Sequence, residues 1–312
     1  MDRIEADLIR RVAELRKMPP YQAALAYRDL VRMEAPLIRL RLQDPVVRQK
    51  YDNYLKTYER PIPSRYFTDH NYAQKLIPIV ELVRSGKVRS VLDAACGNGF
   101  EAVLFALFGV SVQANDCTNE RYTITQTRAE FYRELVGDSF RLKASLSNIM
   151  DGDTALDRYD VVFVQEAISH IHPAEQFLAL VSRRYLVPGG RLVVCDSNGW
   201  NPFLRARITR HLWAERRTVR HYLVEFTDPR TGRPFLVAEE RLFGPPTMRR
   251  MLRAAGLVPE RTWMSGFALP MLVRRPASSV ARWVDRTSRT IPIVRAIGGL
   301  YTIVARNPEF AR

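Results

Sequence analysis

The sequence predicts an α/β protein built on a doubly wound, mostly parallel sheet. Between residues 88 and 195, short apolar runs typical of buried strands alternate with helical stretches. Glycine turns interrupt this pattern at Gly97-Asn98-Gly99 and Pro188-Gly189-Gly190. The 312 residues, 46% hydrophobic and 26% charged, suffice for one large domain or two unequal ones.

Residues 1–86 are expected to form a helical N-terminal cap over the ligand cleft. The first helix has apolar residues at helical spacing and ends at a proline pair: Ile4, Leu8, Val12 and Leu15, then Pro19-Pro20. Asp44-Pro45 has the pattern of an N-cap followed by proline in the first helical position. A further helix is expected from about Asn71 to Gly86.

The core is expected to span residues 87–199. Its predicted strands are 88–96, 110–117, 140–146, 159–164 and 191–195, and its predicted helices follow the first glycine turn to about 108 and cover 119–136 and 173–187. Such alternation predicts parallel strands with helices on both faces of the sheet.

The last third mixes helices and strands. Residues 200–245 are expected to form an insertion after the fifth strand that covers an acceptor site, and residues 246–312 to return to the core. The insertion is predicted as a basic helix (203–220) and a hairpin (221–226 and 235–243), and the return as a helix (246–255), a strand (257–265), a basic amphipathic helix (277–297) and a last strand (301–305).

The glycine turn after the first strand has the composition of a ligand-binding loop. Asp93 ends the strand, and small residues with Gly97 and Gly99 let a ligand approach the backbone closely. Asp116 ends the next strand, 23 residues later, where a doubly wound fold places an acid to bind ribose hydroxyls. The turn lacks G-x-G-x-x-G, so a dinucleotide pyrophosphate is not its natural ligand. Asp93 suits a ligand with a cationic amino-acid part.

These features resemble those of the class I S-adenosylmethionine (SAM)-dependent methyltransferases. The landmarks are Leu92-Asp93-Ala94-Ala95-Cys96-Gly97-Asn98-Gly99, Asp116, Tyr159-Asp160-Val161-Val162 and Leu186-Val187-Pro188-Gly189-Gly190-Arg191-Leu192. The resemblance covers residues 88–197, with weaker echoes at 246–265 and 301–306. It implies a Rossmann-like sheet of the seven-stranded methyltransferase type, SAM as the cofactor and an enzyme that transfers a methyl group.

The resemblance also implies a set of cofactor-binding residues. They are Asp93, Ala95, Gly97 and Gly99 in the loop, Asp116 and Cys117 after strand two, Ser145 and Leu146 at strand three, and Gln165 after strand four. The sequence departs from the family at two places. Ala95 stands where glycine is usual, and Ser145-Leu146-Ser147 replaces an acid that bonds the adenine amino group. Ser145 would accept that bond as a neutral group.

The segment after strand four holds the expected catalytic residues. His170 and His172 follow Glu166 there, and an imidazole at this edge suits a general base that takes a proton from an oxygen or nitrogen nucleophile. The alternative is that one histidine packs against or caps the helix beginning at Pro173. No metal site is expected, because no third ligand stands at a recognisable spacing. Asp196-Ser197-Asn198 forms a second candidate rim.

Charge is concentrated in the last third. The chain has a net charge of +15, and residues 200–312 carry 21 basic side chains, all arginine, against 8 acidic ones. Trp200 and Trp213 bracket one basic helix, and Trp283 lies in the other beside Arg282, Arg286 and Arg289, which are expected on one side. This composition suits an anionic membrane surface, and the alternative is a core-facing stripe with a solvated arginine face.

The acceptor is expected to be a small or lipid-like molecule, methylated on oxygen or nitrogen. An RNA methyltransferase is the first alternative, supported by charge, although nucleic acid is the less favoured partner. A SAM-binding or membrane-binding protein without catalysis is the second. The first residues lack an apolar signal core, so a cytoplasmic protein is expected. If the basic helices bind an anionic membrane, the protein is expected to contact that membrane peripherally. The sequence does not indicate the oligomeric state or exclude methylation on carbon.

Overall fold

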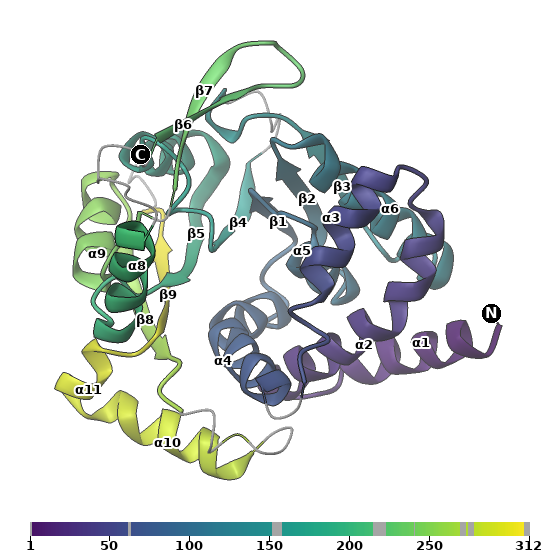
Figure 1. The fold of residues 1–312 in the computed structure, drawn as a ribbon, viewed down its shortest axis with the longest axis horizontal. Helices are drawn as coiled ribbons and strands as arrows, with labels where there is room; N and C mark the ends of the chain where they lie inside the picture. The colour runs from purple at the N-terminus through teal and green to yellow at the C-terminus, as the bar shows by residue number, and fades with distance from the viewer. Residues whose placement is uncertain are drawn as a thin grey trace.

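The computed structural model describes residues 2–61, 64–151, 158–214, 223–239, 241–268, 273 and 278–308. Its centre is a twisted seven-stranded sheet in the order β3-β2-β1-β4-β5-β9-β8 (Figure 1). The strands are β1 (Ser90–Ala94), β2 (Ser111–Asp116), β3 (Leu142–Leu146), β4 (Tyr159–Gln165), β5 (Leu186–Ser197), β8 (Val258–Ser265) and β9 (Leu300–Arg306). Only β9 runs antiparallel to its neighbours in this sheet, β5 and β8. The predicted fold class is confirmed.

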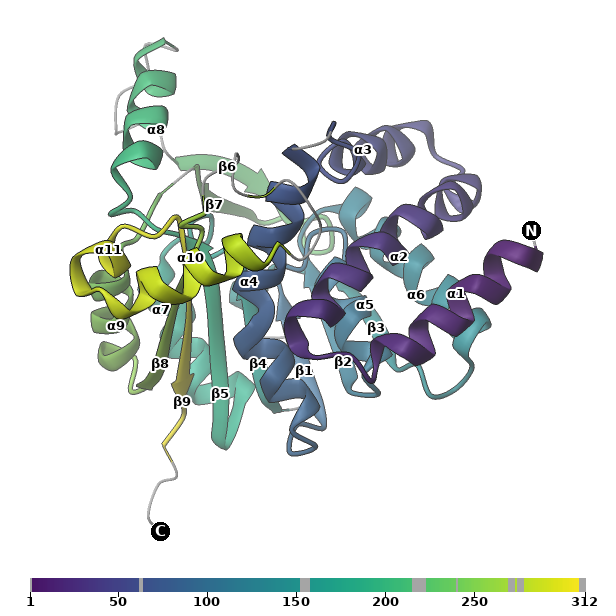
Figure 2. The same ribbon diagram turned by 90° about the horizontal axis from the view of Figure 1, so that it is seen from below.

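Helices cover both faces of the sheet. The N-terminal helices are α1 (Asp2–Leu15), α2 (Pro20–Arg41), α3 (Pro45–Leu55) and α4 (Ser64–Arg84), and the helices between strands are α5 (Phe100–Leu107), α6 (Asn119–Val136), α7 (Ala174–Leu180) and α9 (Pro245–Ala254). Figures 1 and 2 show α1 to α3 gathered beside α6, with α8 to α11 at the β8 side of the sheet.

The remaining elements belong to the last third of the chain. They are α8 (Pro202–Ala214), a hairpin of β6 (Leu223–Thr227) and β7 (Pro234–Ala238), α10 (Ser279–Thr290) and α11 (Pro292–Ala296). Figure 2 shows α8 projecting from the body of the molecule. The predicted hairpin and strands are present. The end of the predicted 203–220 helix, residues 221–222 and the start of the predicted 277–297 helix lie outside the described residues.

Three element boundaries differ from prediction. The strand β5 begins at Leu186 and includes Pro188-Gly189-Gly190, which the sequence predicted as a turn, because Leu186 already pairs with Tyr159 of β4. The last basic helix is broken into α10 and α11, since Pro292 cannot continue the hydrogen bonding of a helix. The helix α4 begins at Ser64, earlier than predicted.

The core lies on both faces of the sheet and follows the alternation of its strands. On β4, Val161 and Phe163 join one buried cluster and Val162 and Val164 join the other. The first cluster is shared with α1 to α6. The helix α4 packs against β5, β8 and β9, so the last helix of the predicted cap also covers the sheet.

The helix α10 carries a polar face toward the body of the protein. Asp285 is fully buried and accepts hydrogen bonds from the backbone amides of Phe267 and Ala268. Arg289 donates to the carbonyl of Met264 (2.7 Å) and to the side chain of Gln74. The expectation that Arg282, Arg286 and Arg289 share one solvated side is therefore wrong for Arg289. The hydrogen bonds of Asp285 and Arg289, and not only the apolar side chains, determine which face of α10 packs against the protein.

Candidate active site

The loop after β1 turns sharply through three residues with positive φ. Ala95, Gly97 and Gly99 have φ values of 54°, 58° and 66°. Glycine adopts this region freely, whereas alanine does so at a cost of about 1–2 kcal/mol. The structure therefore holds Ala95 in a conformation that glycine would reach without strain, at the position where the sequence departs from its relatives.

The two glycines of the loop have different surroundings. A Cβ atom on Gly99 would lie 2.6 Å from the Cγ2 atom of Thr125, so only glycine fits where α5 begins against α6. A Cβ atom on Gly97 would meet nothing within 4 Å. Gly97 thus faces open space, which leaves its backbone accessible to a ligand.

Beneath the loop lies a group of buried polar side chains with unused acceptors. Asp93 and Glu101 are 2% and 5% exposed. Gln165 donates from Nε2 to Oε1 of Glu101 at 2.6 Å, while Oε1 of Gln165 and Oδ2 of Asp93 have no partner among the described residues. Burial, reinforced by the neighbouring Glu101, raises the pKa of Asp93 well above its usual range. A cationic donor placed here would satisfy both acceptors.

Asp116, at the end of β2, is bonded to the loop itself. Its Oδ2 accepts from the backbone amide of Gly97 at 3.0 Å, and its Oδ1 accepts from the amide and hydroxyl of Thr118, both at 2.9 Å. An ionised carboxylate has about four acceptor positions, so one remains at Oδ2. Asp116 is 2% exposed, and Nη1 of Arg121 lies 3.7 Å from Oδ2. The contact with ribose hydroxyls stays a prediction.

The other predicted cofactor residues lie along the same edge. Cys117 follows Asp116, is partly buried, and burial raises the pKa of its thiol to about 11. Ser145 and Leu146 end β3, where the Ser145 hydroxyl donates to the carbonyl of Ala114 at 3.4 Å. That hydroxyl can still accept a hydrogen bond, so the assignment to adenine stays a prediction.

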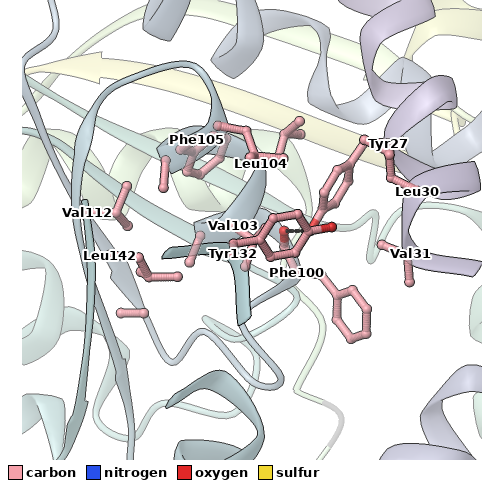
Figure 3. Packing of buried hydrophobic residues seen from close by; sticks show 14 of the residues in the cluster. Tyr27, Leu30, Val31, Phe100, Val103, Leu104, Phe105, Val112, Tyr132 and Leu142 are labelled. Carbon is pink, nitrogen blue, oxygen red and sulfur yellow. Dashed lines mark hydrogen bonds between the residues drawn. The ribbon is translucent and has the colours of Figure 1, made fainter. Parts of the chain in front are cut away.

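The glycine loop is fixed from behind by residues that the sequence analysis did not single out. Arg128 of α6 is fully buried, pairs with Glu34 of α2 at 2.7 Å, and donates to the carbonyl of Asn98 at 3.0 Å. Tyr27 of α2 donates to the carbonyl of Phe100 (Figure 3). The N-terminal helices therefore anchor the loop as well as covering the sheet.

After β4 the chain takes an unusual backbone turn at Glu166. Its φ is 48°, and its amide donates to the carbonyl of Cys195 at 2.7 Å. The side chain is half exposed, and its Oε1 lies 2.7 Å from Nζ of Lys75, a buried residue of α4. The Lys75 ammonium lowers the pKa of Glu166 against the opposing effect of burial. Glu166 is therefore a carboxylate at neutral pH and cannot serve as a proton donor.

The Lys75–Glu166 pair should make the free energy of unfolding depend on pH in the acidic range. Because the folded-state pKa of Glu166 is lowered from 4.5, its contribution is present above that pH and is lost as the pH falls through the lower folded value. We expect less than about 1 kcal/mol, since solvent screens a half-exposed carboxylate. Urea unfolding at pH 7, 5, 4 and 3 should show a steeper acid loss for the native protein than for Lys75→Met. Parallel curves would contradict the pairing.

The structure distinguishes the two candidate histidines by their hydrogen bonds. The Nδ1 atom of His170 lies 2.9 Å from the carbonyl oxygen of Ala238. Because a carbonyl only accepts, Nδ1 carries the proton of the neutral ring and Nε2 keeps a free lone pair. His170 is exposed, whereas Nδ1 of His172 is buried without a partner among the described residues. Of the two, His170 is the one oriented to accept a proton at Nε2.

The hairpin β6–β7 fixes His170 and spans the carboxyl edge of the sheet. At one end, Ile171 forms a bridge with Val237, and the amide of Ala238 donates to the carbonyl of His170. At the other end, the turn residue Asp228 accepts from the amide of Asn148, just beyond β3, at 3.2 Å. The hairpin thus crosses from the end of β3 to the end of β4 as a cover.

A further acid and an aromatic side chain complete the surroundings. Asp196, at the end of β5, accepts from the amides of Ser169 and Ser197, and burial raises its pKa to about 6. His170 lies close enough to Glu166 and Asp196 to act on their pKa values. Tyr54 of α3 stacks on Phe100 with ring centroids 4.9 Å apart, and Glu101 and Glu166 act on the pKa of its hydroxyl.

Sequence reasoning missed the residues that hold this site together. Lys75 and Arg128 lie in helices whose sequence pattern does not distinguish a buried cation from a solvent-exposed one. Asp228 lies in a turn, where acidic residues are common for local reasons. Asn198, predicted as part of a second rim of the site, is fully buried, and it and Asn201 donate to carbonyls of residues 296–298. In the described part of the chain, no three His, Cys, Asp or Glu side chains gather where they could hold a metal ion.

Comparisons with known proteins agree with this geometry. Residues 92–194 match the family of methyltransferase domains. The chain is similar to magnesium protoporphyrin IX methyltransferase from Synechocystis, solved with bound SAH (TM-score 0.52, 14% identity, 83% of this chain and 94% of that chain). It is also similar to an S-adenosylmethionine-dependent methyltransferase from Clostridium acetobutylicum (TM-score 0.50, 11% identity, 83% and 98%). No curated protein sequence matches the chain.

Proposed function

Because residues 92–194 match the family of methyltransferase domains, we propose that this chain is a class I SAM-dependent methyltransferase. It would transfer the methyl group of SAM to an oxygen or nitrogen of a small-molecule or lipid-like acceptor, with His170 as the general base. The observation that carries the proposal is the hydrogen bond from His170 to the Ala238 carbonyl, which leaves Nε2 free at the carboxyl edge of the sheet.

The residues under the glycine loop fit SAM. The buried acceptors Oδ2 of Asp93 and Oε1 of Gln165 lack donors among the described residues, and the ammonium of a bound methionine part would supply them. The open space at Gly97 and the remaining acceptor position of Asp116 suit a ribose. When bound, SAM supplies an electrophilic methyl group on a sulfonium.

The protein's own part in the reaction is to orient the acceptor, hold a proton and exclude water. His170 would take the acceptor's proton at Nε2, and its Nδ1–H stays bonded to Ala238 throughout. Glu166, kept ionised by Lys75, would accept a hydrogen bond from the acceptor or stabilise the imidazolium that forms. The hairpin and Tyr54 would keep the site dry.

The acceptor class is supported by the lining of this edge. Tyr54 is 39% exposed and stacks on the buried ring of Phe100, next to the carboxylates of Glu101 and Glu166. Its exposed ring suits a flat or apolar body bearing one hydroxyl or amine. The similar enzyme from Synechocystis acts on magnesium protoporphyrin IX, itself a small molecule.

The proposal is tested by incubating the protein with SAM labelled on the methyl group and a panel of phenols, amines, porphyrins, lipids and transfer RNA. Label should pass to a hydroxyl- or amine-bearing small molecule or lipid. Transfer to RNA alone would establish the rival activity. SAM binding without transfer to any acceptor class would contradict the assignment of a base.

Replacing Asp116 with Ala should weaken SAM binding at least tenfold, because it removes charge-assisted bonds to ribose worth ~1.5–3 kcal/mol each. Isothermal calorimetry measures the affinity. Thr118→Val is the matched control, because it removes a bond to Asp116 within the protein and leaves the carboxylate in place. Unchanged affinity in Asp116→Ala would overturn the ribose contact.

A further inference from the structure

A surface groove of about 300 Å³ lies on the β8 side of the molecule, among α9, β8, α11 and the start of α8. Trp200, Pro245, Arg249 and Arg295 are among its lining residues. The Trp200 ring sits against Gly244, where a Cβ atom would come within 2.3 Å of it. The wall of the groove is therefore preformed, because only glycine at 244 leaves room for this ring.

The charge inside the groove is not balanced. Glu260, the acidic residue in the lining, is already paired with Arg191 at 3.1 Å and with Arg306 at 2.9 Å. Arg261 pairs with Glu81 at 2.6 Å. Arg249 and Arg295 have no carboxylate partner among the described residues. Two guanidinium groups thus face one groove without an anion, which favours a phosphate-bearing ligand.

Hydrogen bonds hold the floor of the groove. Asn198, fully buried, donates to the carbonyls of Ala296 (2.9 Å) and Gly298 (2.8 Å). Asn201 donates to the carbonyl of Ile297 at 2.7 Å. These bonds tie the end of α11, which carries Arg295, to the segment that carries Trp200.

Large apolar side chains are exposed on the elements that form the groove and on the neighbouring α10. Ile293 follows the lining residue Pro292 and is 82% exposed, and Phe203, three residues after Trp200, is 79% exposed. Trp283 on α10 is 65% exposed. Monomeric surfaces rarely carry so many large exposed apolar side chains close to free cations unless they meet a partner. Apolar anchors beside arginines match the interface of an anionic bilayer.

We propose that this groove binds the phosphate headgroup of an anionic phospholipid, with Ile293 and Phe203 entering the adjoining acyl region, so that the protein docks peripherally on an anionic membrane. The occupant is a lipid because the cations and the exposed apolar side chains are adjacent; a soluble phosphate would use only the former. No described helix is long and apolar enough to cross a bilayer. The proposal does not depend on which acceptor is methylated.

Flotation of the full chain with vesicles tests the proposal. Vesicles of phosphatidylcholine alone are compared with vesicles of phosphatidylcholine and phosphatidylglycerol in equal parts, at low and at physiological salt. We expect binding to the anionic vesicles that weakens with salt. Replacing both Arg249 and Arg295 with Gln should lower the partition coefficient by roughly 25-fold, because each cation near an anionic surface contributes about fivefold.

The matched control is the double variant Arg183→Gln/Arg253→Gln, which removes the same charge from exposed arginines outside the groove. Equal loss in both double variants would overturn the groove and leave only a diffuse electrostatic attraction. Ile293→Ser should also weaken binding, whereas Leu40→Ser, at a 71% exposed position on α2, should not. Absence of binding to anionic vesicles at low salt, or binding to an RNA oligonucleotide instead, would overturn the proposal. Thermal melting of each variant verifies folding.

Discussion

Replacing His170 with Ala is expected to lower kcat by about 10²–10⁴-fold while leaving SAM affinity unchanged. The reason is that the bond from Nδ1–H to the Ala238 carbonyl fixes the tautomer and leaves the lone pair of Nε2 free to accept a proton. The backbone bridge between Ile171 and Val237 does not need the imidazole, so the hairpin should keep its place. Steady-state kinetics with the acceptor found in the label-transfer assay gives kcat, and calorimetry gives the SAM affinity.

His172→Ala is the matched control and should keep near-native turnover, because no hydrogen bond orients that ring among the described residues. The pH–rate profile offers a second readout, since loss of a base removes the rise in rate with pH, whereas a merely structural defect lowers the rate at every pH. Native turnover in His170→Ala would contradict the role of His170 as the base. The reaction would then be a methylation of carbon or one catalysed by positioning of the reactants alone.

Arg128→Met should lower the free energy of unfolding by about 3–5 kcal/mol, because it leaves the fully buried Glu34 carboxylate without its partner. It also removes the donor to the Asn98 carbonyl, so SAM affinity should fall as the glycine loop loosens. Chemical denaturation measures the first effect and calorimetry measures the second.

The double variant Arg128→Met/Glu34→Leu separates these two effects. Removing both charges should restore most of the stability, since a buried pair replaced by apolar side chains is often neutral or stabilising. SAM affinity should stay low, because the bond to Asn98 is still missing. A double variant as unstable as Arg128→Met, or one that regains native SAM affinity, would contradict the assigned role.

The strands of the core sheet and the position of its ligand loop could be predicted from the sequence alone. The strands of the core are short and apolar, and the glycine turn with Asp93 and Asp116 marks where they meet a ligand, because these signals are local and repeat in order along the chain. The same local signals predicted the hairpin β6–β7 and the helix α9. The break between α10 and α11 was also readable from Pro292, although the helix was predicted as one.

The contacts between polar side chains, in contrast, could not be predicted before the packing of the elements was known. Lys75 pairs with Glu166, 91 residues away in the sequence, and Arg128 pairs with Glu34, 94 residues away. The spacing of apolar residues along the chain does not predict such pairs. His170 is oriented by a hydrogen bond to Ala238, which the hairpin brings to it, whereas Nδ1 of His172 has no partner among the described residues. Likewise Arg289 turns inward and Arg295 faces a groove, although both stand in one basic stretch. The hydrophobic pattern predicts helices and strands because each apolar side chain contributes to burial according to its own position in the element. The partner of a charged side chain depends instead on how elements distant in the sequence pack together.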